Sequence, residues 1–253
     1  MTVRIRPMTC GWLETNLGML FAGGTGRIRL PIPSVLIEHP KGRAVFDTGL
    51  HADLANDTSR LRSSQDLFDV HMVAGDALGP QLESLDVDPA RVDFVVNSHL
   101  HFDHCGGNAA LPNATLVVQR PEWAAGHVDK LIARDVYNPG DFDLGQPVQL
   151  LDGEHDLFGD GTLVLHPTPG HTAGHQSLWV ATPSRPTFLL CDAAYLIAPM
   201  RGRRLPGVLW DADAMLASWD RIEAVEAATG ARLVATHELD WETSVPRPPD
   251  AWD

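Results

Sequence analysis

Short hydrophobic runs recur along most of this chain, and many of them end at glycine, proline or aspartate. Apolar and β-branched residues concentrate at 34–39, 43–47, 92–97, 114–119, 162–166, 176–182, 187–192 and 232–236. Runs of this length and composition predict β-strands, several of them buried. Pro40, Lys41 and Gly42 separate the first two runs, so these are expected to form a hairpin.

Helical periodicity is clear in fewer places. Leucines recur at helical spacing within 76–85, which predicts a helix there. Pro121 is typical of the first turn of a second helix. Asp211 can cap a long helix that ends at Gly230, and this helix carries an apolar stripe along one side. The pattern therefore predicts an α+β protein in which strands outnumber helices.

Two segments have no clear period. Residues 7–33 are rich in glycine, proline and threonine, so we expect mostly loop, with part of it lying as a flap over a site. Residues 51–75 are predicted to be loop or short helices, and His51 and His71 within them to be surface histidines. No linker or low-complexity segment divides the chain, which predicts a single domain over 1–253.

Composition and charge narrow the class of protein. Hydrophobic residues make up 44% and charged residues 21%, as in ordinary globular proteins. The net charge of −14 disfavours a nucleic-acid partner, because like charges repel at long range. No apolar run is long enough to span a membrane. The three cysteines are few and odd in number, and the N-terminus lacks a signal-peptide pattern, so we expect a cytoplasmic protein. The sequence leaves a homodimer open.

The candidate chemistry begins in the stretch Ser98–Asn108. His99, His101, Asp103 and His104 lie within six positions. Imidazole and carboxylate ligands suit a cation such as zinc, but four exceed what one catalytic site takes while keeping a position open for water. In extended backbone, residues two apart share a face. One loop could therefore supply two ions, His99 and His101 to one, Asp103 and His104 to the other.

Three further ligand candidates follow later β-runs. They are His171, Asp192 and His237. His99, His101 and His171 would form a first triad, and Asp103, His104 and His237 a second triad, with Asp192 bridging the two ions and a hydroxide completing both. Such a site is electron-poor, activates water and polarises a carbonyl, so hydrolysis of an acyl compound needs no serine or cysteine nucleophile.

Several neighbouring residues have two interpretations. Asp47 could form an ordinary turn or support the ligands from behind. Cys105 is interpreted as a small buried residue that packs the loop, and His175 as a structural residue. Cys191 should face away from the metals, because it precedes Asp192 on a strand.

The motif His99-x-His101-x-Asp103-His104, followed by His171, Asp192 and His237, resembles the metallo-β-lactamase superfamily. This resemblance implies an αββα sandwich, two mixed β-sheets flanked by helices, with two divalent metal ions at one edge. Zinc is the expected metal, and iron, cobalt or manganese would also suit the ligands.

Within that superfamily, residues 98–108, 117–123, 168–178 and 192–195 are similar to the N-acyl homoserine lactonases, which open the lactone ring of bacterial quorum signals. The similarity implies a metal-dependent lactone hydrolase with a small lactone as its substrate. It also implies that Tyr195 faces the lactone and stabilises the developing oxyanion. Asp103 or Asp192 would relay a proton to the leaving oxygen.

Other activities share the same metal frame. The Cys105-Gly106-Gly107 sequence also resembles 4-pyridoxolactonases, and thioesterases and β-lactamases are further alternatives. A non-enzymatic metal-binding protein predicts lost ligands, whereas all seven are present. Met19, Leu20 and Phe21 could form an apolar wall for an acyl chain.

Overall fold

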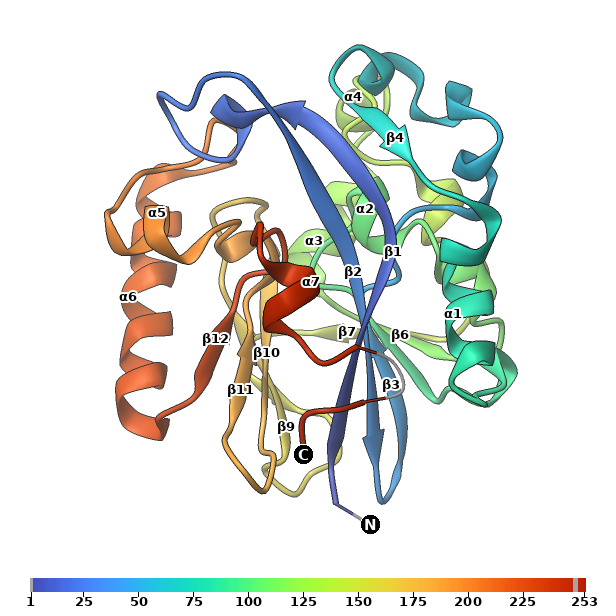
Figure 1. Cartoon of the computed structure of the whole chain (residues 1–253), viewed down its shortest axis with the longest axis vertical. Helices are drawn as coiled ribbons and strands as arrows, with labels where there is room; N and C mark the ends of the chain where they lie inside the picture. The colour runs from blue at the N-terminus through green and yellow to red at the C-terminus, as the bar shows by residue number, and fades with distance from the viewer. Residues whose placement is uncertain (1, 248–249) are drawn as a thin grey trace.

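Two β-sheets face each other in the computed structural model, which describes residues 2–247 and 250–253 (Figure 1). The first sheet has the order β4-β1-β2-β3-β5-β6-β7 and the second has the order β12-β11-β10-β9-β8. The strands of the first sheet are β1 (Arg4–Asn16), β2 (Arg27–His39), β3 (Gly42–Phe46), β4 (Asp69–His71), β5 (Phe94–Val96), β6 (Thr115–Gln119) and β7 (Val148–Leu151). Those of the second are β8 (His155–Asp156), β9 (Leu163–Pro167), β10 (Gln176–Val180), β11 (Thr187–Leu189) and β12 (Arg232–Val234).

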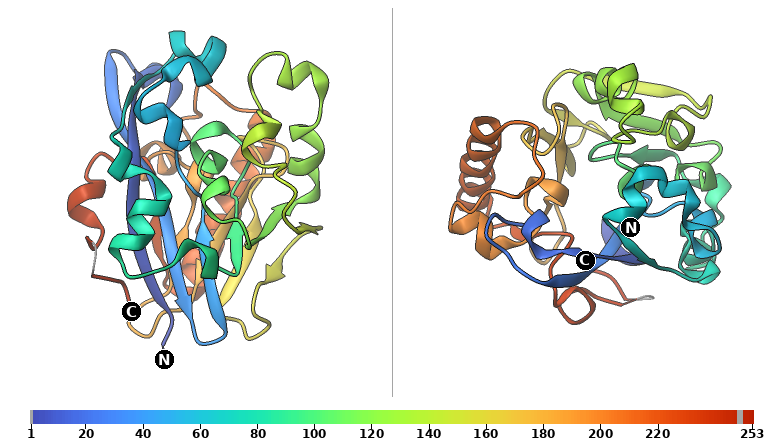
Figure 2. Two further views of the ribbon diagram at one scale, coloured as in Figure 1. Left: turned by 90° about the vertical axis from the view of Figure 1, so that its right-hand side faces the viewer. Right: turned by 90° about the horizontal axis from the view of Figure 1, so that it is seen from above.

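Both sheets are mixed, and helices cover their outer faces. Strands β3, β5, β6 and β7 run parallel, as do β11 and β12, whereas the remaining pairs are antiparallel. The helices are α1 (Leu78–Ser84), α2 (Phe102–Cys105), α3 (Arg120–Gly126), α4 (Asp129–Ile132), α5 (Ile197–Arg201), α6 (Ala212–Thr229) and α7 (Trp241–Ser244). Seen from above, α6 lies outside one sheet and α1 outside the other (Figure 2). The predicted αββα sandwich is confirmed.

Apolar side chains pack both between the two sheets and against their outer faces. Side chains from both sheets, including Phe46 and Leu178, fill the space between them. Leu78 and Leu82 of α1 pack on the outside of the first sheet. Burying each such side chain contributes on the order of 2 kcal/mol to the free energy of folding. The first sheet buries apolar side chains on both of its faces.

The long helix α6 follows its sequence signals closely. Asp211 accepts a hydrogen bond from the amide of Ala214 at 2.8 Å, and Gly230 ends the helix with a φ of 67°. Met215 and Trp219 are buried against the second sheet. The cap, stop and apolar stripe predicted for this segment are all present.

The prediction of a mostly irregular segment at 7–33 was wrong. Strands β1 and β2 pair along nearly their whole length, and only the connection between them is irregular. Gly11, with a φ of 100°, lies where the register shifts between Thr9 and Trp12. Glycine and proline are tolerated in strands at such bulges, so the composition concealed a strand that its partners stabilise.

Residues 51–75 form short 3-10 helices and β4, largely as predicted. In the described part of the chain, no helix is long and apolar enough to cross a membrane.

Candidate metal centre

All of the predicted ligands lie where strands of the two sheets end. His99 and His101 follow β5, and α2 begins directly afterwards with Asp103 and His104 in its single turn. Later segments after β9, β11 and β12 place His171, Asp192 and His237 beside them. Carboxyl ends of strands commonly carry the sites of sheet proteins, because loops there converge.

The first triad is compact and entirely imidazole. The Nδ1 atom of His101 lies 3.0 Å from Nε2 of His99 and 2.9 Å from Nε2 of His171. Ligand atoms held about 2.0–2.1 Å from a tetrahedral zinc ion lie about 3.3 Å apart, so these spacings suit one cation.

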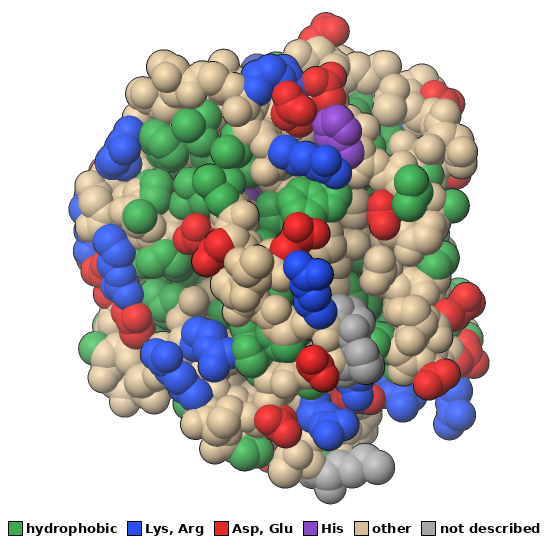
Figure 3. Space-filling model, viewed as in Figure 1, with side chains coloured by type: hydrophobic (Ala, Val, Ile, Leu, Met, Phe, Trp, Pro, Cys, Tyr) green, Lys and Arg blue, Asp and Glu red, His purple; other side chains and the backbone are tan. Residues whose placement is uncertain are grey.

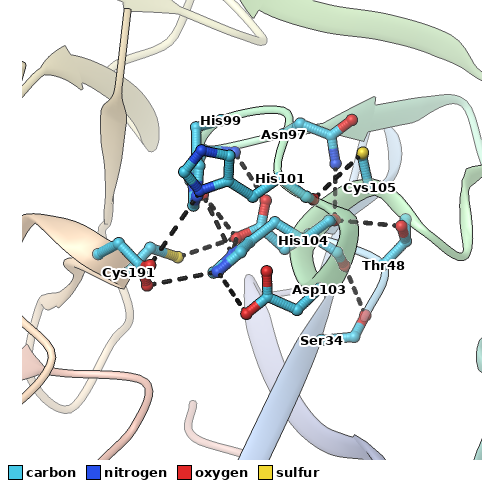
Figure 4. Close-up of polar contacts among 12 residues, drawn as sticks. Ser34, Thr48, Asn97, His99, His101, Asp103, His104, Cys105 and Cys191 are labelled. Atoms are coloured by element: carbon cyan, nitrogen blue, oxygen red, sulfur yellow. Dashed lines mark hydrogen bonds and ion pairs between the residues drawn. The ribbon is translucent and has the colours of Figure 1, made fainter. Parts of the chain in front are cut away.

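The second triad contains a carboxylate. Oδ2 of Asp103 lies 3.6 Å from Nε2 of His104, and His237 completes the group. Figure 4 shows Asp103 and His104 projecting from the same helical turn, with His99 and His101 on the preceding loop. The adjacent Asp103 and His104 share a triad because α2 is helical, so the alternation of faces expected of extended backbone does not extend to them.

Asp192 lies between the two triads. Its Oδ2 atom is 3.3 Å from Nε2 of His171 and 3.9 Å from Nε2 of His99. Its Oδ1 atom is 3.3 Å from Nε2 of His104 and 3.2 Å from Nε2 of His237. Each carboxylate oxygen thus faces a different triad, which is the geometry a bridging ligand requires.

The atoms at the centre of the cluster fit a cation. Nε2 of His104 and Oδ1 of Asp192 are buried without a hydrogen-bond partner among the described residues. Ser98 Oγ donates to Asp47 and therefore accepts from His99 Nδ1, which leaves the His99 Nε2 lone pair facing Nδ1 of His101 at 3.0 Å. Converging bare lone pairs are costly unless a positive charge lies between them.

Charge differs between the two triads. Burial, and then the neighbouring imidazoles, lower the pKa of His99 well below its usual value. Burial also lowers the pKa of His101, so both are neutral, which is the form that binds metals. Burial opposes a proton on His104 as well, but Asp192 and Asp103 outweigh it and raise its pKa well above the usual value. The carboxylates that favour a proton there would equally favour a cation.

Asp47 supports the second triad from behind. Its carboxylate accepts hydrogen bonds from the Ser98 amide at 2.6 Å, the Ser98 hydroxyl at 2.7 Å and His104 Nδ1 at 2.8 Å. The Cys191 thiol also donates to it, at 3.1 Å. A carboxylate behind a histidine fixes the ring and its tautomer, so the supporting interpretation of Asp47 is the correct one.

The remaining polar neighbours are structural. Cys105 is buried, and its thiol donates to the carbonyls of Leu100 at 3.4 Å and His101 at 3.2 Å. Burial raises its pKa well above the usual value, and no described metal-type cluster includes this thiol. His175 Nδ1 bonds to the Thr168 hydroxyl at 2.9 Å, and no described metal-type cluster includes His175.

Tyr195 lies beside the cluster, as its position in the sequence predicts. Its hydroxyl is 3.1 Å from Nδ1 of His171, and its ring centroid is 5.5 Å from that of His237. Burial raises the pKa of its phenol well above the usual value, so the hydroxyl keeps its proton. It can therefore act as a hydrogen-bond donor at neutral pH.

Comparison with known proteins agrees with this geometry. The model of the Metallo-beta-lactamase superfamily matches residues 27–237. The N-acyl homoserine lactonase AttM of Azorhizobium caulinodans is 34% identical over 238 residues, which are 91% of this chain and 90% of that protein. The chain belongs to the metallo-β-lactamase superfamily. It is a hydrolase of this fold, related to N-acyl homoserine lactonases, and its buried His/Asp cluster is typical of their dinuclear metal sites.

More distant relatives share the same architecture. An N-acyl homoserine lactonase from a Bacillus species is 29% identical, with 84% of this chain and 83% of that protein covered. A solved structure of an N-acyl homoserine lactone hydrolase, with N-hexanoyl-L-homoserine bound at its catalytic metal centre, superposes with a TM-score of 0.89. It is 24% identical and is matched over 99% of this chain and 100% of its own, which shows the fold.

In this superfamily member, a cavity of about 220 Å³ opens beside the cluster. His101, Asp103 and Tyr195 contribute to its lining, together with apolar side chains: Leu13, Met19, Leu20, Leu30, Ile32 and Phe68. Figure 3 shows hydrophobic side chains gathering at the upper left, where Figure 1 draws the β1–β2 connection beside α5.

Of the three wall residues predicted from the sequence, Met19 and Leu20 line this cavity. Phe21 does not line it and instead lies beneath the Arg204 guanidinium, 4.3 Å from its ring centroid. Leu30 and Ile32 were missed because the segment was predicted to be loop. Their alternation with arginine and proline was the available signal for a strand with one apolar face.

Proposed function

We propose that this hydrolase opens the ring of N-acyl homoserine lactones and uses two divalent metal ions to do so. The observation that carries the proposal is that Tyr195 and five of the seven ligand candidates line a cavity whose other walls are largely apolar. A small neutral lactone with an acyl tail matches both sides, because its polar ring would meet the cluster and its tail the apolar wall.

In this proposal His99, His101 and His171 would hold one ion and Asp103, His104 and His237 the other, and Asp192 would serve both. When bound, the ions supply an activated water and polarise the lactone carbonyl. Zinc is the metal proposed, and iron, cobalt or manganese also suit these ligands.

Tyr195 and Asp103 supply the remaining chemistry. His171 directs Nε2 into the cluster, so its Nδ1 carries a proton and can donate to the Tyr195 oxygen. The phenol hydroxyl also hydrogen-bonds Asp192, so a bound lactone oxygen would replace that acceptor as negative charge develops on it. Asp103 is half-buried at the cavity, where its carboxylate can pass a proton to the departing ring oxygen.

The ligands come from loops of both sheets, so the proposal takes residues 1–253 as one functional domain. All three cysteines are free and buried, which supports the proposed cytoplasmic location, where thiols stay reduced.

Acid release by purified, zinc-loaded protein tests the proposal. The substrates would be homoserine lactones of graded acyl length, 4-pyridoxolactone, a simple γ-lactone, a β-lactam and a thioester. We expect turnover of the acyl homoserine lactones, with a lower KM as the tail lengthens. Rapid turnover of another class, with none of the homoserine lactones, would refute the proposed substrate.

A further inference from the structure

A second buried carboxylate lies behind the first triad. Glu122 of α3 has no exposed surface and accepts four hydrogen bonds. Oε1 accepts from the Leu100 amide and the Tyr137 hydroxyl, both at 3.0 Å. Oε2 accepts from the Thr172 hydroxyl at 2.6 Å and the Gly174 amide at 3.1 Å. Each carboxylate oxygen therefore accepts two hydrogen bonds, one from a backbone amide and one from a hydroxyl group.

These donors belong to the loops that carry the first triad. Leu100 lies between His99 and His101, and Thr172 directly follows His171. One carboxylate therefore ties together two chain segments about seventy positions apart, each bonded through a residue next to a candidate ligand.

The backbone at Gly174 lies in close contact with the backbone of Glu122. A Cβ at Gly174 would lie 2.2 Å from the Glu122 amide nitrogen, so only glycine lets the His171 loop reach α3. No lysine or arginine in the described part of the chain forms an ion pair with Glu122, so the four donors alone offset its burial. A buried carboxylate is costly to keep, which argues that its replacement would disturb these loops.

Asp47 and Glu122 have no hydrogen-bond partner in common. Asp47 contacts His104 directly, whereas none of the hydrogen bonds of Glu122 reaches the second triad. We propose that Glu122 is the positioning residue of the first triad, holding the His99–His101 loop and the His171 loop at the separation that lets three imidazoles bind one divalent ion. This inference rests on the proposed dinuclear site.

Zinc titration of the metal-free protein tests this role without any substrate. Thr172→Val removes one of the four donors and keeps the side-chain volume, whereas Thr172→Ser keeps the hydroxyl. In a His237→Ala background, where the first triad is the intact site, Thr172→Val should weaken zinc binding roughly 10- to 100-fold. Thr172→Ser should restore it.

The reciprocal background assigns the effect to one site. With His101→Ala, the second triad is the intact site, and Thr172→Val should leave its zinc affinity within about twofold. Glu122→Gln should reproduce the loss in the His237→Ala background. Each oxygen of Glu122 accepts from one backbone amide, so the NH2 group of glutamine would face a backbone N–H that cannot accept a hydrogen bond. If Glu122→Gln fails to fold, the comparison of Thr172→Val with Thr172→Ser still tests the inference.

Equal weakening in both backgrounds, or none in either, would overturn the inference. Absence of lactone turnover by the zinc-loaded parent would refute the proposed function and leave this result unaffected, because zinc binding is measured separately.

Discussion

The two triads of the cluster differ in charge. The first is three imidazoles, and burial holds the pKa of His99 and His101 low. The second includes Asp103, and nearby carboxylates raise the pKa of His104 and of His237 against the effect of burial. The first triad is therefore a neutral site that depends on exact placement, and the second is an anionic site that attracts a cation at longer range.

The buried carboxylates behind the two triads also differ in what they contact. Asp47 bonds the His104 ring itself, at 2.8 Å, so it orients a ligand and adds negative charge beside it. Glu122 bonds the chain beside the ligands of the first triad and touches none of their rings. A metal site can thus be supported through a ligand ring or through the loops that carry the ligands. Removing one support should therefore weaken metal binding mainly at the triad that it holds.

Asp192→Asn should have the largest effect, because the two oxygens of this carboxylate face different triads. The amide keeps the size of the side chain but loses the charge and one acceptor oxygen. We expect loss of most of the bound zinc, and turnover lower by more than about 100-fold. Zinc content and acid release measure both. Full zinc content in the variant would show that Asp192 does not bridge.

Asp47→Asn should act mainly on the second triad. We expect its zinc affinity to fall roughly 10- to 100-fold in the His101→Ala background. A smaller loss is expected in the His237→Ala background, because Asp47 also bonds Ser98 next to His99. Titration with zinc measures each affinity. A larger loss of zinc affinity at the first triad would show that Asp47 supports mainly that triad.

Tyr195→Phe should leave both zinc affinities within about twofold and lower kcat at least about tenfold for acyl homoserine lactones. The ring remains, and only the hydroxyl that can donate to a developing oxyanion is lost. Steady-state kinetics on zinc-loaded protein measures the change. Unchanged kinetic constants would remove Tyr195 from the proposed chemistry.

The smallest effect is expected at an exposed carboxylate, which serves as a reference for the buried ones. Hydrogen bonds from Lys41 and Thr162 lower the pKa of Asp160 to about 2. Asp160 precedes β9, whereas His171 follows the other end of that strand. Its folded pKa lies below the unfolded value of 3.8, so its stabilisation is present above that value and is lost as the pH falls toward 2.

Asp160→Asn should therefore lower the urea midpoint slightly at pH 6 and leave it unchanged near pH 2. Zinc content should match the parent. A difference between parent and variant that grew as the pH fell would have the wrong sign for this mechanism.

The sequence by itself determined the features that depend on local chemistry. The cap at Asp211 and the stop at Gly230 lie beside the helix that they bound, and leucine spacing was enough to identify α1. The ligand candidates were identifiable because each is a histidine or aspartate at the end of a β-type run or within a few residues after it. Their assignment to two ions remains a prediction that the zinc titrations will test.

Only the tertiary structure decided which distant residues support and enclose these ligands. Nothing within a few positions of Glu122 indicates that it joins the loops at Leu100 and Thr172. The apolar wall from β1 and β2 was hidden for the same reason, since bulges and strand pairing override a composition typical of loops. Caps and periodicity act over one or two turns, whereas pairing and buried hydrogen bonds join residues that meet only when the chain has folded.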